Sequence, residues 1–174
     1  MTDITTRAQA IRLIALDVDG VMSDGCVVYG NSGEETKAFN IKDGLGIKLA
    51  QSAGIEIAII TGRTAPLLAR RAKELGIEAV IQGREDKLIA LKELANSRAL
   101  NLEQCAYMGD DLPDLSAIMA AGLGTCPADA LADVKAHSHW VSTHNGGRGA
   151  VRDLCELILK AQGHWAQIIA SYKP

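Results

Sequence analysis

Short and mostly continuous aliphatic runs recur along the chain and predict the strands of a buried sheet. They cover residues 12–18, 55–61, 78–82, 105–109, 123–127 and 139–142. Continuous rather than alternating apolar residues are typical of strands covered on both faces, as in a parallel sheet. Between the runs, apolar spacings of three and four predict helices over 44–53, 65–75, 85–95, 112–121, 131–136 and 150–170. This alternation predicts an α/β fold with a doubly wound parallel sheet in a single domain spanning 1–174.

Glycines mark the turns between these elements. Gly54, Gly76 and Gly122 follow three of the predicted helices, where a left-handed terminal residue is common. After the first strand, residues 26–41 interrupt the alternation and form two short extended pieces around a turn that contains Gly33. We therefore expect a β-hairpin insertion after the first strand.

Composition and charge restrict the class of protein. The chain has 174 residues, of which 48% are hydrophobic, 22% charged and 3% aromatic, and its net charge is -3. This composition supports a sizeable core, and the mild acidity with few aromatic rings argues against a nucleic-acid partner. No charged-then-apolar leader and no apolar run of about 20 residues is present, so we expect a cytoplasmic protein without a membrane partner. The four cysteines form no CxxC pair and fit free thiols in a reducing compartment.

Polar residues and two glycines gather where the predicted strands end. They are Asp17, Asp19, Thr61, Gly62, Arg63, Lys87, Gly109, Asp110 and Asp111. The carboxyl ends of parallel strands meet at one edge of a sheet, which is where ligands bind in this architecture. Carboxylates against an apolar core need a compensating cation, and oxygen ligands suit Mg²⁺. We interpret the nearby Asp114 as holding the N-terminus of the following helix, where negative charge is favourable, rather than as a metal ligand.

This set of residues predicts phosphoryl transfer. Asp17 can attack a phosphorus centre and form an aspartyl phosphate. Asp19, two residues further on, can protonate the leaving oxygen as general acid and then act as general base. Thr61 can donate to the phosphoryl oxygens, Lys87 can offset their charge, and Asp110 can complete the metal shell.

The same residues carry a resemblance to a known superfamily. The segments DVDGVM from Asp17, ITGR around Thr61, Lys87 and GDDLPD from Gly109 resemble the four motifs of the haloacid dehalogenase superfamily. Longer stretches, at 23–49, 61–77, 82–91 and 146–163, are similar to 3-deoxy-D-manno-octulosonate 8-phosphate phosphatases. The resemblance implies a capless Rossmann-like core. It also implies a Mg²⁺-dependent tetramer that releases phosphate from an eight-carbon sugar acid in lipopolysaccharide biosynthesis.

The resemblance also implies roles for individual residues. Asp17 and Asp110 correspond to metal ligands through their side chains, and Asp19 to a ligand through its backbone carbonyl. The residues that match substrate contacts are Asp19, Asn40, Ile41, Lys42, Asp43, Gly44, Lys48, Arg63, Arg71 and Lys87. Lys48 departs from the family, in which arginine is common, and an ammonium cannot make the bidentate pair of a guanidinium. The tail 164–174 also differs from the family.

Three alternatives stay open on the sequence alone. A phosphatase of another sugar-acid phosphate, such as a nine-carbon keto-acid 9-phosphate, would share the chemical core. A phosphorylation-dependent signalling module also combines acids, Mg²⁺, Thr and Lys. In that module, however, the residue that receives the phosphoryl group follows the third strand. Here the motif Asp17-Val-Asp19 ends the first strand, and its second acid gives an enzyme a way to turn over. A catalytically silent binding protein is disfavoured because all four motifs are intact.

The spacing of the motifs leaves no room for a cap domain. Residues 20–60 already hold the hairpin, a helix and a strand, and residues 62–86 hold a helix and a strand. Excluding water strengthens electrostatic stabilisation, so a neighbouring subunit is expected to cover the site. The apolar edges of the hairpin at 26–41 could be buried in a symmetric ring, which predicts a homotetramer with residues 40–48 near a neighbour's substrate.

Overall fold

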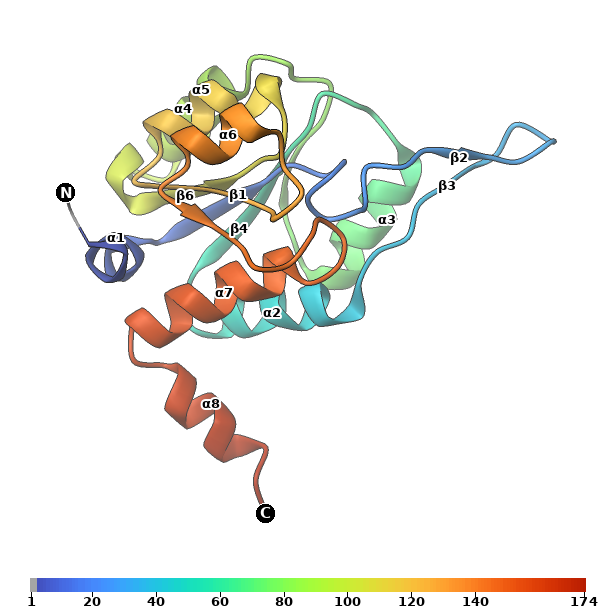
Figure 1. Cartoon of the computed structure of the whole chain (residues 1–174). Coiled ribbons are helices and arrows are strands. Elements are labelled where there is room, and N and C mark those ends of the chain that lie inside the picture. Colours follow the sequence, from blue (N-terminus) through green and yellow to red (C-terminus); the bar gives the residue numbers. More distant parts are fainter. Residues whose placement is uncertain (1–2) are drawn as a thin grey trace.

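Six parallel strands form the central sheet in the computed structural model, which describes residues 3–174 (Figure 1). They are β1 (Leu13–Leu16), β4 (Glu56–Ile60), β5 (Ala79–Ile81), β6 (Cys105–Met108), β7 (Leu123–Cys126) and β8 (Trp140–Val141). Their spatial order is β5-β4-β1-β6-β7-β8, with every neighbouring pair parallel. The chain winds outward from β1 in both directions, which confirms the predicted doubly wound sheet.

Helices cover both faces of this sheet. They are α1 (Ile4–Ala10), α2 (Ile41–Ser52), α3 (Pro66–Leu75), α4 (Lys87–Ser97), α5 (Leu115–Ala120), α6 (Ala132–His137), α7 (Ala150–Ala161) and α8 (Trp165–Ser171). Short 3₁₀ turns occur at Leu102–Gln104 and Leu112–Asp114. Figure 1 shows α2 and α7 side by side on one face and α4, α5 and α6 on the other. Among residues 3–174, no helix is both long and apolar enough to cross a membrane.

Strand β1 illustrates why the aliphatic runs are continuous. Leu13 and Ala15 pack into the core on the α4 and α5 side, whereas Ile14 and Leu16 pack on the α2 and α7 side. All four residues are completely buried. Burying a leucine or isoleucine side chain stabilises the fold by about 1.5–3 kcal/mol, so both faces of the central strand favour apolar residues.

The predicted helix over 150–170 is wrong in one respect, because the structure divides it into α7 and α8. Gly163 lies between them with a φ of +80°, a left-handed conformation that favours glycine and ends α7. Gln162 donates from Nε2 to the carbonyl oxygen of Ile11 at 2.8 Å and so ties the end of α7 to the end of α1. Helix α1 was not predicted, since Ala8 is its only buried residue and the segment carries no apolar stripe.

The three glycines after helices do not behave alike. Gly54 and Gly76 have φ values of +85° and +69°, as expected for left-handed helix ends. Gly122 does not adopt a positive φ, so that prediction is wrong. A Cβ atom at Gly122 would lie 2.1 Å from the carbonyl oxygen of Glu103, so the glycine is needed for a close backbone approach instead.

The predicted hairpin is present between β1 and α2 and projects from the molecule (Figure 1). Strand β2 (Val28–Tyr29) pairs antiparallel with β3 (Glu35–Thr36). Gly33 turns the chain with a φ of +87°. Val28 is 56% exposed and Tyr29 is 67% exposed, so the apolar side chains of β2 have little cover within one chain.

Candidate active site

A cavity of about 280 Å³ opens at the carboxyl edge of the sheet. It is lined by Asp17, Asp19, Gly25, Thr61, Gly62, Arg63, Glu85, Lys87, Asp110, Asp111, Pro113 and Asp114. The polar residues that follow β1, β4 and β6 in the sequence therefore meet at one place. The structure brings together all four residues for which we predicted catalytic roles and all three predicted metal ligands.

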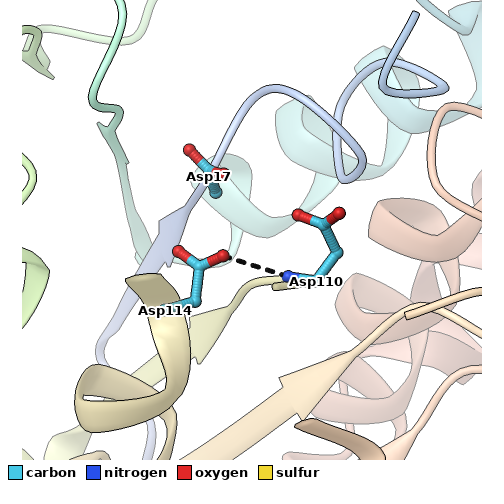
Figure 2. A group of neighbouring side chains, drawn as sticks. All are labelled: Asp17, Asp110 and Asp114. Carbon is cyan, nitrogen blue, oxygen red and sulfur yellow. Dashed lines mark hydrogen bonds between the residues drawn. The ribbon is translucent and has the colours of Figure 1, made fainter. Parts of the chain in front are cut away.

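Three carboxylates form the centre of this cavity, and we call Asp17, Asp110 and Asp114 the acidic cluster. Each offers one ligand oxygen, and these oxygens all lie within 4.8 Å of one another. Figure 2 shows the carboxylates around one space beyond the ends of β1 and β6. Gly20 makes room for them, because a Cβ atom there would lie 2.1 Å from Oδ2 of Asp110. Gly20 also has a φ of +84°, which disfavours other residues.

Lys87 is the positive partner of the cluster. It is the first residue of α4 and is only 3% exposed. Its Nζ atom lies 2.9 Å from Oδ1 of Asp17 and 3.0 Å from Oδ1 of Asp114. Burial alone would lower the pKa of Lys87, but the two carboxylates outweigh burial and raise this pKa above its ordinary value. Lys87 therefore stays charged beside the cluster.

The acidic cluster carries more negative charge than Lys87 can offset. Desolvation, followed by repulsion from Asp114, raises the pKa of Asp17 to about 6. The same two causes, joined by Asp17, raise the pKa of Asp110 to about 7. Such shifts mark a site that lacks positive charge, and the carboxylate oxygens of Asp17 and Asp110 suit a hard divalent cation such as Mg²⁺. The residues present therefore fit the predicted metal.

Asp114 differs from the other two carboxylates because its oxygens already accept four hydrogen bonds. Oδ1 accepts from Nζ of Lys87 at 3.0 Å and from the hydroxyl of Tyr107 at 2.7 Å. Oδ2 accepts from the backbone N–H groups of Asp110 at 3.1 Å and Asp111 at 3.4 Å. A carboxylate has about four acceptor positions, so little capacity is left for a metal. The bond from Asp111 holds the 3₁₀ turn Leu112–Asp114, but no side-chain bond from Asp114 caps α5, so the helix-capping prediction holds at the turn only and the side chain also serves Lys87 and Tyr107.

The carboxylate of Asp19 is turned toward the hairpin rather than toward the acidic cluster. It forms an ion pair with Nζ of Lys37, and Nε of Arg63 lies 3.6 Å from its Oδ2. Nη2 of Arg63 also lies 3.0 Å from Oε2 of Glu35. The side chain of Lys37 is only 2% exposed. Sequence reasoning missed Lys37 and Glu35, because their partners lie far away along the chain.

Thr61 is buried at the end of β4, where its Oγ1 accepts a hydrogen bond from the backbone N–H of Arg63 at 3.3 Å. The hydroxyl keeps its own hydrogen for another acceptor in the cavity. This geometry suits the predicted donor to a phosphoryl oxygen.

Seven of the predicted substrate-binding residues do not line the cavity in a single chain: Asn40, Ile41, Lys42, Asp43, Gly44, Lys48 and Arg71. Asn40 caps α2 by accepting from the backbone N–H of Lys42 at 2.8 Å. Asp43 is buried and accepts from the backbone N–H of Arg152 in α7 at 2.8 Å. Ile41 and Lys48 are exposed. The segment therefore presents some residues to solvent and uses others inside the fold.

Arg71 lies beside the start of α2. Its guanidinium stacks over the ring of Phe39 at 5.8 Å, and Nη2 donates to the carbonyl oxygen of Asn40 at 3.4 Å. A Cβ atom at Gly44 would lie 2.6 Å from Nη2, so the glycine makes room for this arginine. Arg71 thus supports the N-terminus of α2, the segment with which it was expected to bind substrate.

The segment Gly146-Gly147-Arg148-Gly149 packs against the loop that follows β1. A Cβ atom at Gly146 would lie 1.8 Å from the carbonyl oxygen of Gly20. The backbone N–H of Gly147 donates to the carbonyl oxygen of Val21 at 2.9 Å. The paired glycines therefore allow two main-chain segments to meet at Gly20, which itself lies against the side chain of Asp110.

The doubly wound sheet, the carboxylates after β1 and β6, and the buried Lys87 together define a hydrolase of the haloacid dehalogenase type. A family profile described as haloacid dehalogenase-like hydrolase matches residues 79–154. At the level of whole chains, a 3-deoxy-D-manno-octulosonate 8-phosphate phosphatase of Yersinia pestis is 50% identical, over 92% of this chain and 86% of that protein. The Escherichia coli phosphatase of the same name is 48% identical, with the same coverage of both chains.

Solved structures agree with these relatives. The crystal structure of the 3-deoxy-D-manno-octulosonate 8-phosphate phosphatase from Moraxella catarrhalis, in complex with a magnesium ion, a phosphate ion and KDO, is 48% identical. Its TM-score is 0.97, and the match covers 99% of both chains. The cobalt-bound phosphatase of Haemophilus influenzae is 40% identical with a TM-score of 0.87, over 90% of this chain and 92% of that one. The chain belongs to the 3-deoxy-D-manno-octulosonate 8-phosphate phosphatase family, as its motifs predicted.

Proposed function

We propose that this chain is a Mg²⁺-dependent phosphatase that hydrolyses 3-deoxy-D-manno-octulosonate 8-phosphate to the free sugar acid and phosphate. The reaction serves lipopolysaccharide biosynthesis. One observation carries the proposal: Asp17, Asp110 and Lys87 converge in one cavity of a chain that matches, over almost its whole length, a relative with bound magnesium, phosphate and KDO.

The reaction has two steps, and both use the carboxylates after β1. In the first, an oxygen of Asp17 attacks phosphorus, the bond from phosphorus to the sugar oxygen breaks, and Asp19 gives its proton to that oxygen. In the second, Asp19 takes a proton from water, whose oxygen attacks phosphorus and breaks the bond to Asp17. Free phosphate leaves, and Asp17 returns to its starting state. Asp19 already lines the cavity, and it has to exchange its ion pair with Lys37 for the leaving oxygen or the water.

The remaining cavity residues bind and orient the phosphoryl group. Lys87 offsets negative charge on Asp17 and on the phosphoryl oxygens, and Thr61 donates a hydrogen bond to them. Mg²⁺, when held by the side chains of Asp17 and Asp110 and the backbone carbonyl of Asp19, supplies the positive charge that Lys87 cannot supply alone. The raised pKa values of Asp17 and Asp110 support this need for a cation.

The proposal includes a homotetramer in the cytoplasm. The exposed Val28 and Tyr29 on β2, together with the exposed Ile41 at the start of α2, favour burial against other subunits. In such an assembly, residues 40–48 of one subunit would lie at the active-site cavity of a neighbouring subunit. That cavity is open in a single chain. The chain's four cysteines are all free, and Cys26 is exposed, which suits a reducing compartment.

Phosphate release from a panel of sugar phosphates, with and without Mg²⁺, tests the proposal. We expect the octulosonate 8-phosphate to be the best substrate, and activity to vanish with a chelator and return with Mg²⁺. A preference for a nine-carbon keto-acid 9-phosphate would keep the chemistry and change the substrate. Recovery with Zn²⁺ alone would contradict the oxygen-ligand site.

A further inference from the structure

Tyr107 is a polar side chain at the centre of the core. It lies on β6 and is completely buried, packed with apolar residues of β1 and α5 such as Leu13 and Ile118. Its hydroxyl donates to Oδ1 of Asp114 at 2.7 Å. Burying a hydroxyl without a partner costs about 1–3 kcal/mol, so a phenylalanine would be the simpler core residue unless this bond has a use.

The bond starts a chain of contacts that leads to the nucleophile. The same Oδ1 of Asp114 accepts from Nζ of Lys87 at 3.0 Å, and that Nζ lies 2.9 Å from Asp17. Tyr107 itself does not line the cavity and lies behind Asp114. It therefore reaches the reacting groups only through Asp114 and Lys87.

A fixed Asp114 matters because Lys87 has a flexible stem. Its ammonium is a point charge on four methylene groups, and its position depends on the acceptors around it. The terminal torsion of an aspartate is broad, so a carboxylate held at one oxygen only can rotate. Backbone N–H groups of Asp110 and Asp111 hold Oδ2, and Tyr107 holds Oδ1. With both oxygens held, Lys87 has one well-defined acceptor on the side away from Asp17.

We propose that Tyr107 is a positioning residue that, through Asp114, fixes the Lys87 ammonium against Asp17 for phosphoryl transfer. Burial and the nearby Asp114 carboxylate raise the pKa of Tyr107 well above its ordinary value, so its hydroxyl remains a donor. The catalytic part of this proposal rests on the proposed phosphatase function, whereas the positioning of Lys87 can be measured without it.

The structure offers a matched pair of variants. Tyr107→Phe removes the hydroxyl and keeps the ring that fills the core. Thr125→Val removes a different buried hydroxyl, which donates to the backbone oxygen of Tyr107 at 3.0 Å and does not bond to Asp114. Both variants lose one buried hydrogen bond, but only the first disturbs the contacts of Lys87.

The kinetic test uses 3-deoxy-D-manno-octulosonate 8-phosphate at saturating Mg²⁺. Tyr107→Phe is expected to lower kcat roughly ten- to hundredfold with little change in KM, because small displacements of a catalytic group have effects of that order. Thr125→Val is expected to keep kcat within about twofold of the wild type, a bound that follows from removing no contact in the cavity. Equal kcat in the two variants would overturn a catalytic role for Tyr107.

A second readout needs neither substrate nor metal. In protein labelled with ¹⁵N at lysine Nζ, the buried Lys87 ammonium is expected to give a slowly exchanging signal, assigned by its absence in Lys87→Met. The signal should broaden or exchange faster in Tyr107→Phe and stay unchanged in Thr125→Val. An unchanged signal in Tyr107→Phe would overturn the positioning role.

The wild type supplies the last check, which does not depend on the folding of any variant. A slowly exchanging Tyr107 hydroxyl proton close to the Lys87 side chain supports the chain of contacts, and its absence would overturn the proposal. A wild type inactive on every sugar phosphate, but with the expected Lys87 and Tyr107 signals, would instead refute the proposed function and keep the positioning of Lys87.

Discussion

The acidic cluster and the hairpin are both near the substrate cavity, yet they differ in how completely one chain builds them. Asp17, Asp114 and Lys87 are buried, and each has its polar partners within the same chain. The strands of the hairpin pair at only two positions, and, although Lys37 and Glu35 form ion pairs with Asp19 and Arg63, Val28 and Tyr29 are mostly exposed. The difference shows that one chain brings the reacting groups together by itself, and it fits our proposal that a second chain shields the site and helps to recognise the substrate.

The physical reason lies in what supports each region. The cluster is attached to the ends of β1 and β6, which pair in parallel from Leu13 with Cys105 to Leu16 with Met108 in the middle of the sheet. An isolated two-stranded hairpin is marginally stable in water, because it has no hydrophobic face to bury. Four predictions test this contrast, beginning with the largest expected effect.

Replacing the nucleophile should abolish turnover and leave the fold intact. An amide at Asp17 is a poor nucleophile and removes a metal-binding charge, so Asp17→Asn is expected to lower kcat by at least ~10³-fold, about 4 kcal/mol. Asp19→Asn should be severely impaired through loss of the proton donor. Phosphate release and circular dichroism measure activity and fold. Asp133→Asn, the same chemical change on α6, is the control, and near wild-type turnover by Asp17→Asn would refute the assignment of the nucleophile.

Placing charges on the hairpin should disturb assembly and activity while the acidic cluster stays intact. The double variant Val27→Asp with Val28→Asp is expected to be a smaller particle by light scattering, because carboxylates cannot be buried between subunits without large cost. Its activity toward the sugar-acid phosphate should fall by roughly 10²-fold through loss of water exclusion and of the neighbour's contacts.

Met119→Asp is the matched control for this variant. Met119 on α5 is as exposed as Val28, at 56%, and lies outside the hairpin. It should keep the wild-type particle size and activity. A monomeric wild type, or a monomeric hairpin variant with undiminished specificity, would contradict the shared site.

Removing Arg71 should affect recognition more than chemistry. Arg71→Ala is expected to reduce kcat/KM for the octulosonate phosphate about tenfold and that for p-nitrophenyl phosphate much less, since only the former has a remote carboxylate. The variant also loses the support of Asn40 and Phe39 at the start of α2. Arg70→Ala, at the exposed neighbour in the same helix, should behave as wild type. Equal losses on both substrates would make Arg71 structural.

Metal binding should depend on Asp17, Asp110 and the backbone carbonyl of Asp19 within one chain, and not on the hairpin. Mg²⁺ at about 100 times its Kd adds about 2.7 kcal/mol to the free energy of unfolding, and the rise in Tm should be equal in the wild type and the hairpin variant. A smaller rise in the hairpin variant would show that the centre needs its neighbour.

The same measurement has a defined pH dependence. The pKa values of about 6 for Asp17 and about 7 for Asp110 are raised above their unfolded values, so the metal-free native state binds more protons than the unfolded chain. Without metal, stability should therefore fall as pH rises from the ordinary aspartate pKa of 3.8 to about 7, and it should level off above 7. Because Mg²⁺ needs deprotonated ligands, its effect on Tm should be largest above pH 7 and shrink as pH falls through 7 and 6. A Tm shift independent of pH between 5 and 8 would contradict this.

Much of this architecture could be predicted because it depends on local patterns. The aliphatic runs located all six strands within about two residues, and the rule for parallel sheets brought Asp17, Thr61 and Asp110 to one edge. Asp17 and Thr61 follow their strands directly and Asp110 follows β6 after one residue, so their positions depend on the sheet.

The features that were missed depend on tertiary contacts. The hydroxyl of Tyr107, in an apolar run, shows its use only beside Asp114, and Lys37 pairs with a residue 18 positions away. Gly122 follows a helix as a left-handed cap would, but its role is set by the distant backbone of Glu103. A periodic pattern cannot report such partners, and it joined α7 to α8 because apolar residues continue across the break at Gly163.

The joint between Gly146 and the loop after β1 has a consequence for engineering new substrate ranges. It is made by main-chain atoms, so it does not depend on which side chains flank it. The neighbouring Asn145 and Arg148 are exposed and can be varied without disturbing the joint, whereas any replacement of Gly146 would push residues 146–149 away from Gly20. Mutant libraries built at 145 and 148, with both glycines kept, should retain a working catalytic centre while the surface of the pocket that Arg148 lines with Asp24 and Asn40 changes.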